Sequence, residues 1–163
     1  YNACQSVNGE VEDYYVEIIP FCPAQGNTVD EYIQEVNVGN LHQVSGNNFG
    51  YTDYTTDDTY RHLPKGQNLP VSLVAGFTNI PYYENFRIWI DYNRNGDFDA
   101  GEIAFEGVAQ GSAPLTGYIF IPENTPSGIT GMRISMKYGS MPEGCPVGSY
   151  MGETEDYMIN TLN

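Results

Sequence analysis

The chain has 163 residues, of which 40% are hydrophobic and 13% aromatic, enough for one domain with a buried core. Its 21 Asp and Glu against 6 Lys and Arg give a formal net charge of -15, which argues against a nucleic-acid surface and against docking on anionic lipid. The sequence holds no apolar run of the roughly eighteen residues that a membrane span needs, so no membrane insertion is expected.

The chain begins with a segment that repeats its own ending. Residues 9–14 read GEVEDY and residues 152–157 read GETEDY, and each stretch follows a cysteine and precedes a strand-like run. A match of this kind indicates an internal repeat. We therefore expect residues 20–163 to form one complete domain. Residues 1–19 are expected to be the terminal strand of a preceding repeat, or a strand exchanged with or donated to a neighbour.

Between these two tails, short runs rich in β-branched and aromatic residues alternate with clusters of Gly, Pro, Asn and Asp. The predicted strands are residues 31–39, 50–56, 69–77, 85–91, 102–108, 116–121, 131–139 and 158–162. Only residues 28–36 have a short helix as an alternative. The spacing predicts an all-β fold, an antiparallel β-sandwich of seven to nine strands with jelly-roll or immunoglobulin-like topology.

The strand at residues 131–139 has the clearest alternation of apolar and polar side chains. Its apolar positions are Met132, Ile134, Met136 and Tyr138, and its polar positions are Arg133, Ser135 and Lys137. This period of two predicts a half-buried strand whose polar face lies in water.

The three cysteines are Cys4, Cys22 and Cys145. They could be buried thiols of a cytosolic protein, or one disulfide and one further cysteine. We favour a Cys22–Cys145 disulfide, because it would join the two ends of the complete domain. In the chain-entropy model, closing so long a loop contributes roughly 4–5 kcal/mol. Cys4 would then have its partner in the preceding copy or in a neighbouring chain.

An acidic stretch, DYNRNGDFDAGE, occupies residues 91–102 between two predicted strands. Counted from its first residue, side-chain oxygens fall at positions 1, 3, 5, 9 and 12, glycine falls at position 6, and position 7 offers its backbone carbonyl. This is the spacing of the EF-hand calcium loop. The candidate metal ligands are Asp91, Asn93, Asn95, Asp97, Asp99 and Glu102. Gly96 permits the sharp bend that the loop requires.

The ion expected in this loop is Ca²⁺. Mg²⁺ retains its waters and suits such a crowded cage poorly, and Zn²⁺ prefers His and Cys ligands. The alternative is an ordinary hairpin loop rich in Asn, Gly and Asp, but its clustered carboxylates would repel one another without a cation. Because strands rather than helices flank the loop, it is expected to brace one hairpin and not to act as a sensor.

The acids of residues 152–157 have two interpretations. The two glutamates should face one side of a strand and the aspartate the other. They could bind a second cation together with Asp53, or form a structural network by accepting backbone hydrogen bonds or pairing with Arg87 or Arg133. The sequence favours the structural network.

Motifs of catalytic sites are missing from the sequence. It contains no HExxH, GxSxG, P-loop or dinucleotide-binding motif, and nothing singles out one pair of carboxylates for sugar hydrolysis. We therefore expect that the protein is not an enzyme.

The order of several motifs resembles one known family. GYTDYT, FRIWIDYNRNGDFDAGE, GMRISMKY, a cysteine and GETEDY follow one another as in the GEVED domain of secreted bacterial proteins. The resemblance covers about residues 22–161, with Thr154 where the motif that names the family has Val. It implies a non-catalytic β-sandwich module located extracellularly or on the bacterial cell surface. Such modules are appended, often in tandem, to secreted proteases, adhesins and large surface proteins.

Two functions follow as expectations. The first is a calcium-stabilised structural or adhesive module in a tandem array or filament, with other copies as head-to-tail partners or a neighbouring chain bound through residues 1–19 and Cys4. The second is a carbohydrate-binding module appended to a secreted enzyme, which would bind surface glycans. Its candidate stacking residues are Tyr51, Tyr54, Tyr60, Tyr82, Tyr83 and Trp89.

Overall fold

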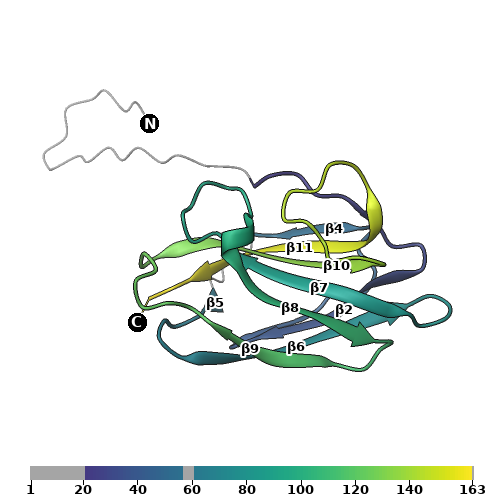
Figure 1. The fold of residues 1–163 in the computed structure, drawn as a ribbon, viewed down its shortest axis with the longest axis horizontal. Coiled ribbons are helices and arrows are strands. Elements are labelled where there is room, and N and C mark those ends of the chain that lie inside the picture. The colour runs from purple at the N-terminus through teal and green to yellow at the C-terminus, as the bar shows by residue number, and fades with distance from the viewer. Residues whose placement is uncertain (1–20, 57–60, 163) are drawn as a thin grey trace, which may run out of the picture.

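The computed structural model describes residues 21–56 and 61–162 (Figure 1). These residues form two facing β-sheets, as predicted for a β-sandwich. They contain eleven strands and one 3₁₀ helix. Nine strands have four residues or more, and the other two have only two residues each, too few to show any periodicity in the sequence.

Four strands make the smaller sheet. They are β2 (Glu31–Val38), β3 (Leu41–Val44), β6 (Asn68–Phe77) and β9 (Leu115–Phe120), in the order β3-β2-β6-β9 with antiparallel pairing throughout. The stretch with a helix-like alternative is thus strand β2. A bulge between Ile33 and Glu35 interrupts its pairing with β6.

Seven strands make the larger sheet. They are β1 (Gly26–Asn27), β4 (Tyr51–Tyr54), β5 (Arg61–His62), β7 (Tyr83–Ile90), β8 (Ile103–Gln110), β10 (Ile129–Tyr138) and β11 (Tyr150–Asn160). Strand β11 pairs antiparallel with β10 on one side. On its other side it pairs in parallel with the short strands β1, β4 and β5. The repeat motif of residues 152–157 therefore lies inside the sheet and not at its edge.

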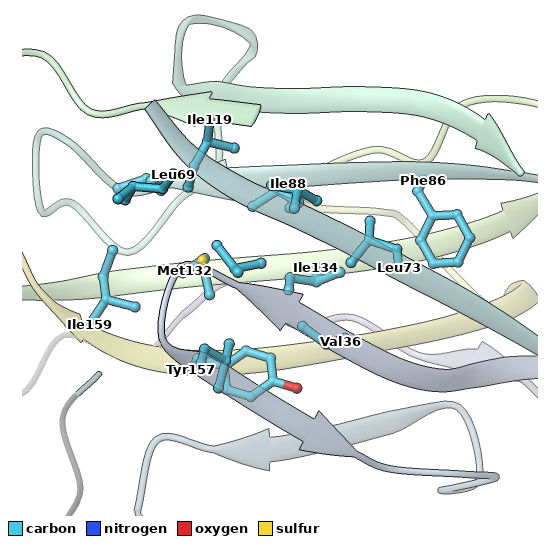
Figure 2. Close-up of a cluster of buried hydrophobic side chains, with 14 of the residues drawn as sticks. Val36, Leu69, Leu73, Phe86, Ile88, Ile119, Met132, Ile134, Tyr157 and Ile159 are labelled. Carbon is cyan, nitrogen blue, oxygen red and sulfur yellow. The ribbon is translucent and has the colours of Figure 1, made fainter. Parts of the chain in front are cut away.

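The apolar side chains that alternate along the strands meet between the two sheets. Figure 2 shows part of this cluster, with Val36 and Leu73 from the smaller sheet and Ile88 and Ile134 from the larger. All four side chains are fully buried. At about 25 cal/mol per Å² of apolar surface removed from water, such contacts are the main favourable contribution to folding.

The prediction that the polar face of β10 lies in water is wrong. Arg133 and Ser135 are 0% exposed, like the apolar residues on the other face. Their side of the strand is covered by a segment around Gly144 and by the chain at Cys22, both of which bond to the Arg133 guanidinium. Alternation identified the two faces correctly, but it could not show that a distant segment covers the polar one.

The interior of the sandwich includes buried carboxyl groups. Glu31 on β2 and Glu84 on β7 are 2% and 0% exposed and belong to opposite sheets. Oε1 of Glu31 and both carboxyl oxygens of Glu84 lack a hydrogen-bond partner in the described part of the chain. Burial, and then the nearby Glu31 charge, raise the pKa of Glu84 to about 8. Glu84 is therefore expected to remain protonated at neutral pH.

The described ranges contain no helix long and apolar enough to cross a membrane. Residues 1–20 lie outside the described residues, and with them Cys4 and the first copy of the repeat motif. The expectation that residues 1–19 belong to a preceding repeat or to a neighbour stays a prediction.

Candidate metal centre

The acidic loop joins two neighbouring strands of the larger sheet, as predicted. It leaves β7 at Asp91 and enters β8 through the short helix η1 (Ala100–Glu102), the small coil in Figure 1. The strands β7 and β8 pair with each other, so the two ends of the loop are held by their ladder. A loop anchored in this way can hold a ligand set without large movements of its flanks.

Asp91 begins the loop and points into it. The side chain is only 2% exposed. One carboxylate oxygen accepts the N–H of Asn95 at 3.1 Å and the other accepts that of Gly96 at 3.0 Å. The backbone of Asp91 is fixed by β10, because its N–H donates to Gly131 and its carbonyl accepts the Thr130 hydroxyl. The first predicted ligand is therefore both buried and rigidly placed.

The two asparagines shape the turn that follows. Asn93 Oδ1 accepts the N–H of Asn95 at 2.9 Å, and Asn95 Oδ1 accepts that of Asp97 at 2.9 Å. These side-chain-to-backbone hydrogen bonds form successive tight turns, which give the loop a compact curved shape. Gly96 has φ of +83°, a conformation that side chains with a Cβ rarely adopt, which agrees with the role predicted for it.

Glu102 closes the loop from the opposite end. It is 4% exposed, and its two carboxylate oxygens accept the N–H groups of Asn93 at 3.3 Å and Asp99 at 3.0 Å. Burial raises the pKa of Glu102, and the charges of Asp91 and Asp99 act in the same direction, while the two donated hydrogen bonds lower it. Asp91 and Glu102, at positions 1 and 12 of the predicted ligand set, thus both accept hydrogen bonds from the backbone of the same loop.

The side chain of Asp97 lies elsewhere. It is exposed and points toward the sulfur of Cys145, with Oδ1 at 3.7 Å. The spacing of the loop predicts that the backbone carbonyl of this residue binds the ion, so the position of the side chain does not contradict that prediction. Asp97, Cys22 and Cys145 also form a compact group of potential metal ligands. Because the two sulfurs are bonded to each other, this group is not a plausible metal site.

No ion pair in the described part of the chain involves a carboxylate of the loop. Within residues 21–56 and 61–162, the only ion pairs join His42 to Glu35, Arg87 to Glu106 and Arg133 to Asp156. Arg94 belongs to the loop, but its guanidinium donates to the carbonyls of Pro126 and Ser127. Two buried carboxylates without a protein cation favour an external one.

The acids of the second repeat motif form an internal network. Asp156 accepts two hydrogen bonds from the Arg133 guanidinium, at 2.7 and 2.6 Å. Glu153 accepts the N–H groups of Ile33 at 2.8 Å and Asn48 at 3.0 Å. As predicted, the glutamates and the aspartate face opposite sides of the strand, and all are 0% exposed. Their partners favour the structural interpretation over a second ion.

Two other residues considered for this network lie outside it. Arg87 pairs with Glu106 at 2.8 Å, at the edge of the larger sheet. Asp53 is exposed and accepts the N–H of Thr55. A cation held jointly by Asp53 and the repeat motif is therefore not supported by the contacts of either.

A disulfide connects the network to the acidic loop. The structure joins Cys22 to Cys145, with the bond that the sequence analysis expects. The N–H of Cys22 donates to Gly96 of the loop at 2.9 Å. Arg133 donates to the carbonyls of Cys22 and Gly144, on the two sides of the disulfide. The loop, the disulfide and the repeat motif thus form one contiguous unit.

Phe98 completes this unit, and sequence reasoning missed it. It is 4% exposed, and its ring lies 4.5 Å from the Arg133 guanidinium carbon. It also packs edge to face against Phe21, with ring centroids 5.2 Å apart. A large apolar residue within an acidic run was the available signal that one side of the loop is buried.

The aromatic residues proposed for sugar stacking do not share one surface. Trp89 is 1% exposed, Tyr54 stacks on Tyr157, and the Tyr51 hydroxyl donates to Asp156. Tyr82 and Tyr83 are exposed, and Tyr60 lies outside the described residues. Three of the five described residues of this set, Trp89, Tyr54 and Tyr51, make contacts within the fold.

Comparison with protein-family models identifies one match. The model of the GEVED domain matches residues 85–160, a shorter stretch than the motifs suggested. The match runs from strand β7 through β11 and includes the acidic loop, Arg133 and Cys145. No curated protein and no solved structure matches the chain. Residues 85–160 of the chain therefore match the GEVED domain, in agreement with the resemblance of its motifs.

Proposed function

We propose that this chain is a non-catalytic extracellular module that Ca²⁺ stabilises and that serves a structural or adhesive role. The observation that carries the proposal is the pair of buried carboxylates, Asp91 and Glu102, in a loop with EF-hand spacing and without a cation from the described residues. Extracellular calcium is plentiful, so a dissociation constant of about 0.1–1 mM would suffice. The disulfide also suits an oxidising compartment.

Adding calcium is expected to raise the melting temperature. With such an affinity, about 10 mM Ca²⁺ would stabilise the domain by roughly 1.4–2.7 kcal/mol. For a domain of this size, that corresponds to an increase of roughly 3–10 °C. The measurement is thermal unfolding by circular dichroism, with Ca²⁺ and with a chelator.

Two variants make the calcium test specific. Asp91→Asn and Glu102→Gln keep the shape of each side chain but remove a charged ligand, so each should abolish most of the calcium-dependent increase. Glu143→Gln is the matched control, because Glu143 is exposed and lies outside the loop. An intact protein whose melting temperature does not change with calcium would contradict the site.

The role in an array or filament is supported by the repeat in the sequence. The second repeat motif is an interior strand of the larger sheet, bonded on both sides. The first motif has nearly the same sequence, so it is suited to pair in the same way with strands of a preceding domain or a neighbouring chain. Residues 1–19 would then link successive copies head to tail, with Cys4 as a second link.

Removing residues 1–19 is expected to abolish self-association without destabilising the domain. Sedimentation velocity should show oligomers that grow with concentration for the full chain and monomers for the chain that starts at Pro20. Melting temperatures of the two chains should agree within about 2 °C, since a segment that pairs with a neighbour adds little to the stability of its own domain. A large decrease on truncation would mean that the segment belongs to its own domain, and would exclude strand addition.

A further inference from the structure

An exposed phenylalanine stands beside a shallow hollow on the surface. The ring of Phe49 is 88% exposed, and its backbone has φ of +63°. A bulky side chain is rarely found in this left-handed conformation, which glycine adopts without strain. Because the exposed ring does not pack within the protein, the backbone strain does not serve the core. We take it as a sign that the ring contacts a ligand.

The backbone that presents Phe49 is held firmly. The next residue, Gly50, approaches Gly26 so closely that a Cβ would lie 2.1 Å from the Gly26 carbonyl oxygen. The Gly50 carbonyl accepts the N–H groups of both Gly26 and Thr154 at 3.1 Å. The Phe49 carbonyl accepts a hydrogen bond from the Gln25 side chain, and its N–H donates to Asn47. The ring therefore projects from a rigid support.

The hollow has the size of a small-ligand site and lacks charge. Its volume is about 570 Å³, within the range of sites that bind small molecules. Its lining combines neutral hydrogen-bonding side chains with two exposed apolar ones: Asn27, Thr28, Asn47, Thr78 and Ser149, with Val29 and Phe49. In a chain with a formal net charge of -15, a hollow lined only by neutral residues favours a neutral ligand.

Two of the polar groups are already oriented. The Thr28 hydroxyl and the Asn47 carboxamide bond to each other at 2.6 Å, and the Asn47 amide nitrogen donates to the Thr28 carbonyl at 2.9 Å. Thr28 begins the segment that leads into β2, and Asn47 lies two residues before Phe49. Groups fixed by the protein lose little conformational entropy when a ligand binds.

We propose that this hollow, with Phe49 at its edge, binds a neutral carbohydrate chain. The apolar C–H face of a pyranose ring would stack on the Phe49 ring, and its hydroxyls would bond with the amides and hydroxyls of the lining. The site differs from the one expected from the tyrosine-rich set in the sequence. It is also independent of the calcium loop, to which it contributes no residue.

The test is binding of neutral hexasaccharides to the full chain in calcium. Cellohexaose, xylohexaose, mannohexaose and chitohexaose serve as probes, and affinity is measured by isothermal titration calorimetry. At least one probe should bind to the intact chain. Phe49→Gly should weaken that binding by roughly tenfold or more, because the stacking surface is lost. The melting temperature of this variant should equal or exceed that of the intact chain, since glycine relieves the strain.

Control variants separate this site from other exposed side chains. Tyr118→Ala removes an aromatic side chain that is 68% exposed on β9, and Val147→Ala shortens a fully exposed apolar one. Both should leave the affinity unchanged. Failure of all four probes to bind, or loss of binding in Tyr118→Ala with retention in Phe49→Gly, would overturn the proposal. A decrease of several degrees in the melting temperature of Phe49→Gly would also overturn it, because the ring would then pack within the chain.

Discussion

Replacing Arg133 with methionine is expected to lower the free energy of unfolding by about 3–5 kcal/mol. The side chains of Arg133 and Asp156 are 1% and 0% exposed, and two hydrogen bonds of 2.6–2.7 Å join them. The substitution would leave the Asp156 carboxylate buried without its cation. Two backbone carbonyls, at Cys22 and Gly144, would lose their donor as well. Urea unfolding monitored by circular dichroism measures the effect.

The exposed ion pair of the same sheet is the control. Arg87 and Glu106 form an ion pair at 2.8 Å, but their side chains are 24% and 49% exposed. Arg87→Met should therefore change the free energy of unfolding by about 1 kcal/mol or less. If Arg133→Met does not fold, Arg133→Lys retains the charge and allows an intermediate decrease to be measured. A value for Arg133→Met as small as that of the control would contradict the buried ion pair.

The stability of the domain is expected to decrease as the pH rises from about 4.5 to 8. Glu84 has its pKa raised by burial to about 8, and Glu155 has its pKa raised by burial to about 7. Between the ordinary and the raised pKa, the folded state keeps a proton that the unfolded state releases, so raising the pH favours unfolding. The change levels off above about pH 8. For Glu84 alone it amounts to at most about 5 kcal/mol.

Substituting Glu84 with glutamine removes the titratable carboxyl group and tests how much it contributes to the pH dependence of stability. The variant should lose most of the decrease between pH 5 and 8, and it should exceed the intact protein in stability at pH 9. Its amide can donate to Oε1 of Glu31, which lacks a partner among the described residues. Glu143→Gln, on the surface, should keep the dependence of the intact chain. Unfolding is measured at constant excess calcium, because the loop carboxylates also titrate, and an intact protein with equal stability at pH 5 and 8 would contradict the prediction.

Of the strands with four residues or more, local sequence predicted all except β3, and it placed the acidic loop between two of them. Alternation places Met132 and Ile134 in the core, and both are fully buried. The spacing from Asp91 to Glu102 places two carboxylates in one turn, where both accept backbone hydrogen bonds. The first prediction uses a period of two residues and the second a motif of twelve residues. Both patterns can be recognised in the sequence alone.

Contacts between distant segments could not be derived in the same way. The alternation of β10 identified the face of Arg133 but gave no sign of the disulfide-linked segments that cover it. Strands β1 and β5 have two residues each, and their parallel pairing with β11 depends on the tertiary fold. Phe49 has a positive φ and precedes Gly50, which approaches Gly26 closely, and no local pattern in the sequence reports this contact.

The central position of β11 constrains how the domain folds. Strand β11 is the last of the described strands in the chain, yet it separates β10 from β1, β4 and β5 in the larger sheet. The short strands have no ladder to join until residues 150–160 are present, so the sheet closes only after most of the chain is available. Pairing between segments so far apart is slow to form. During synthesis, the larger sheet can therefore be completed only after strand β11 has been made, although β7, β8 and β10 can pair before it.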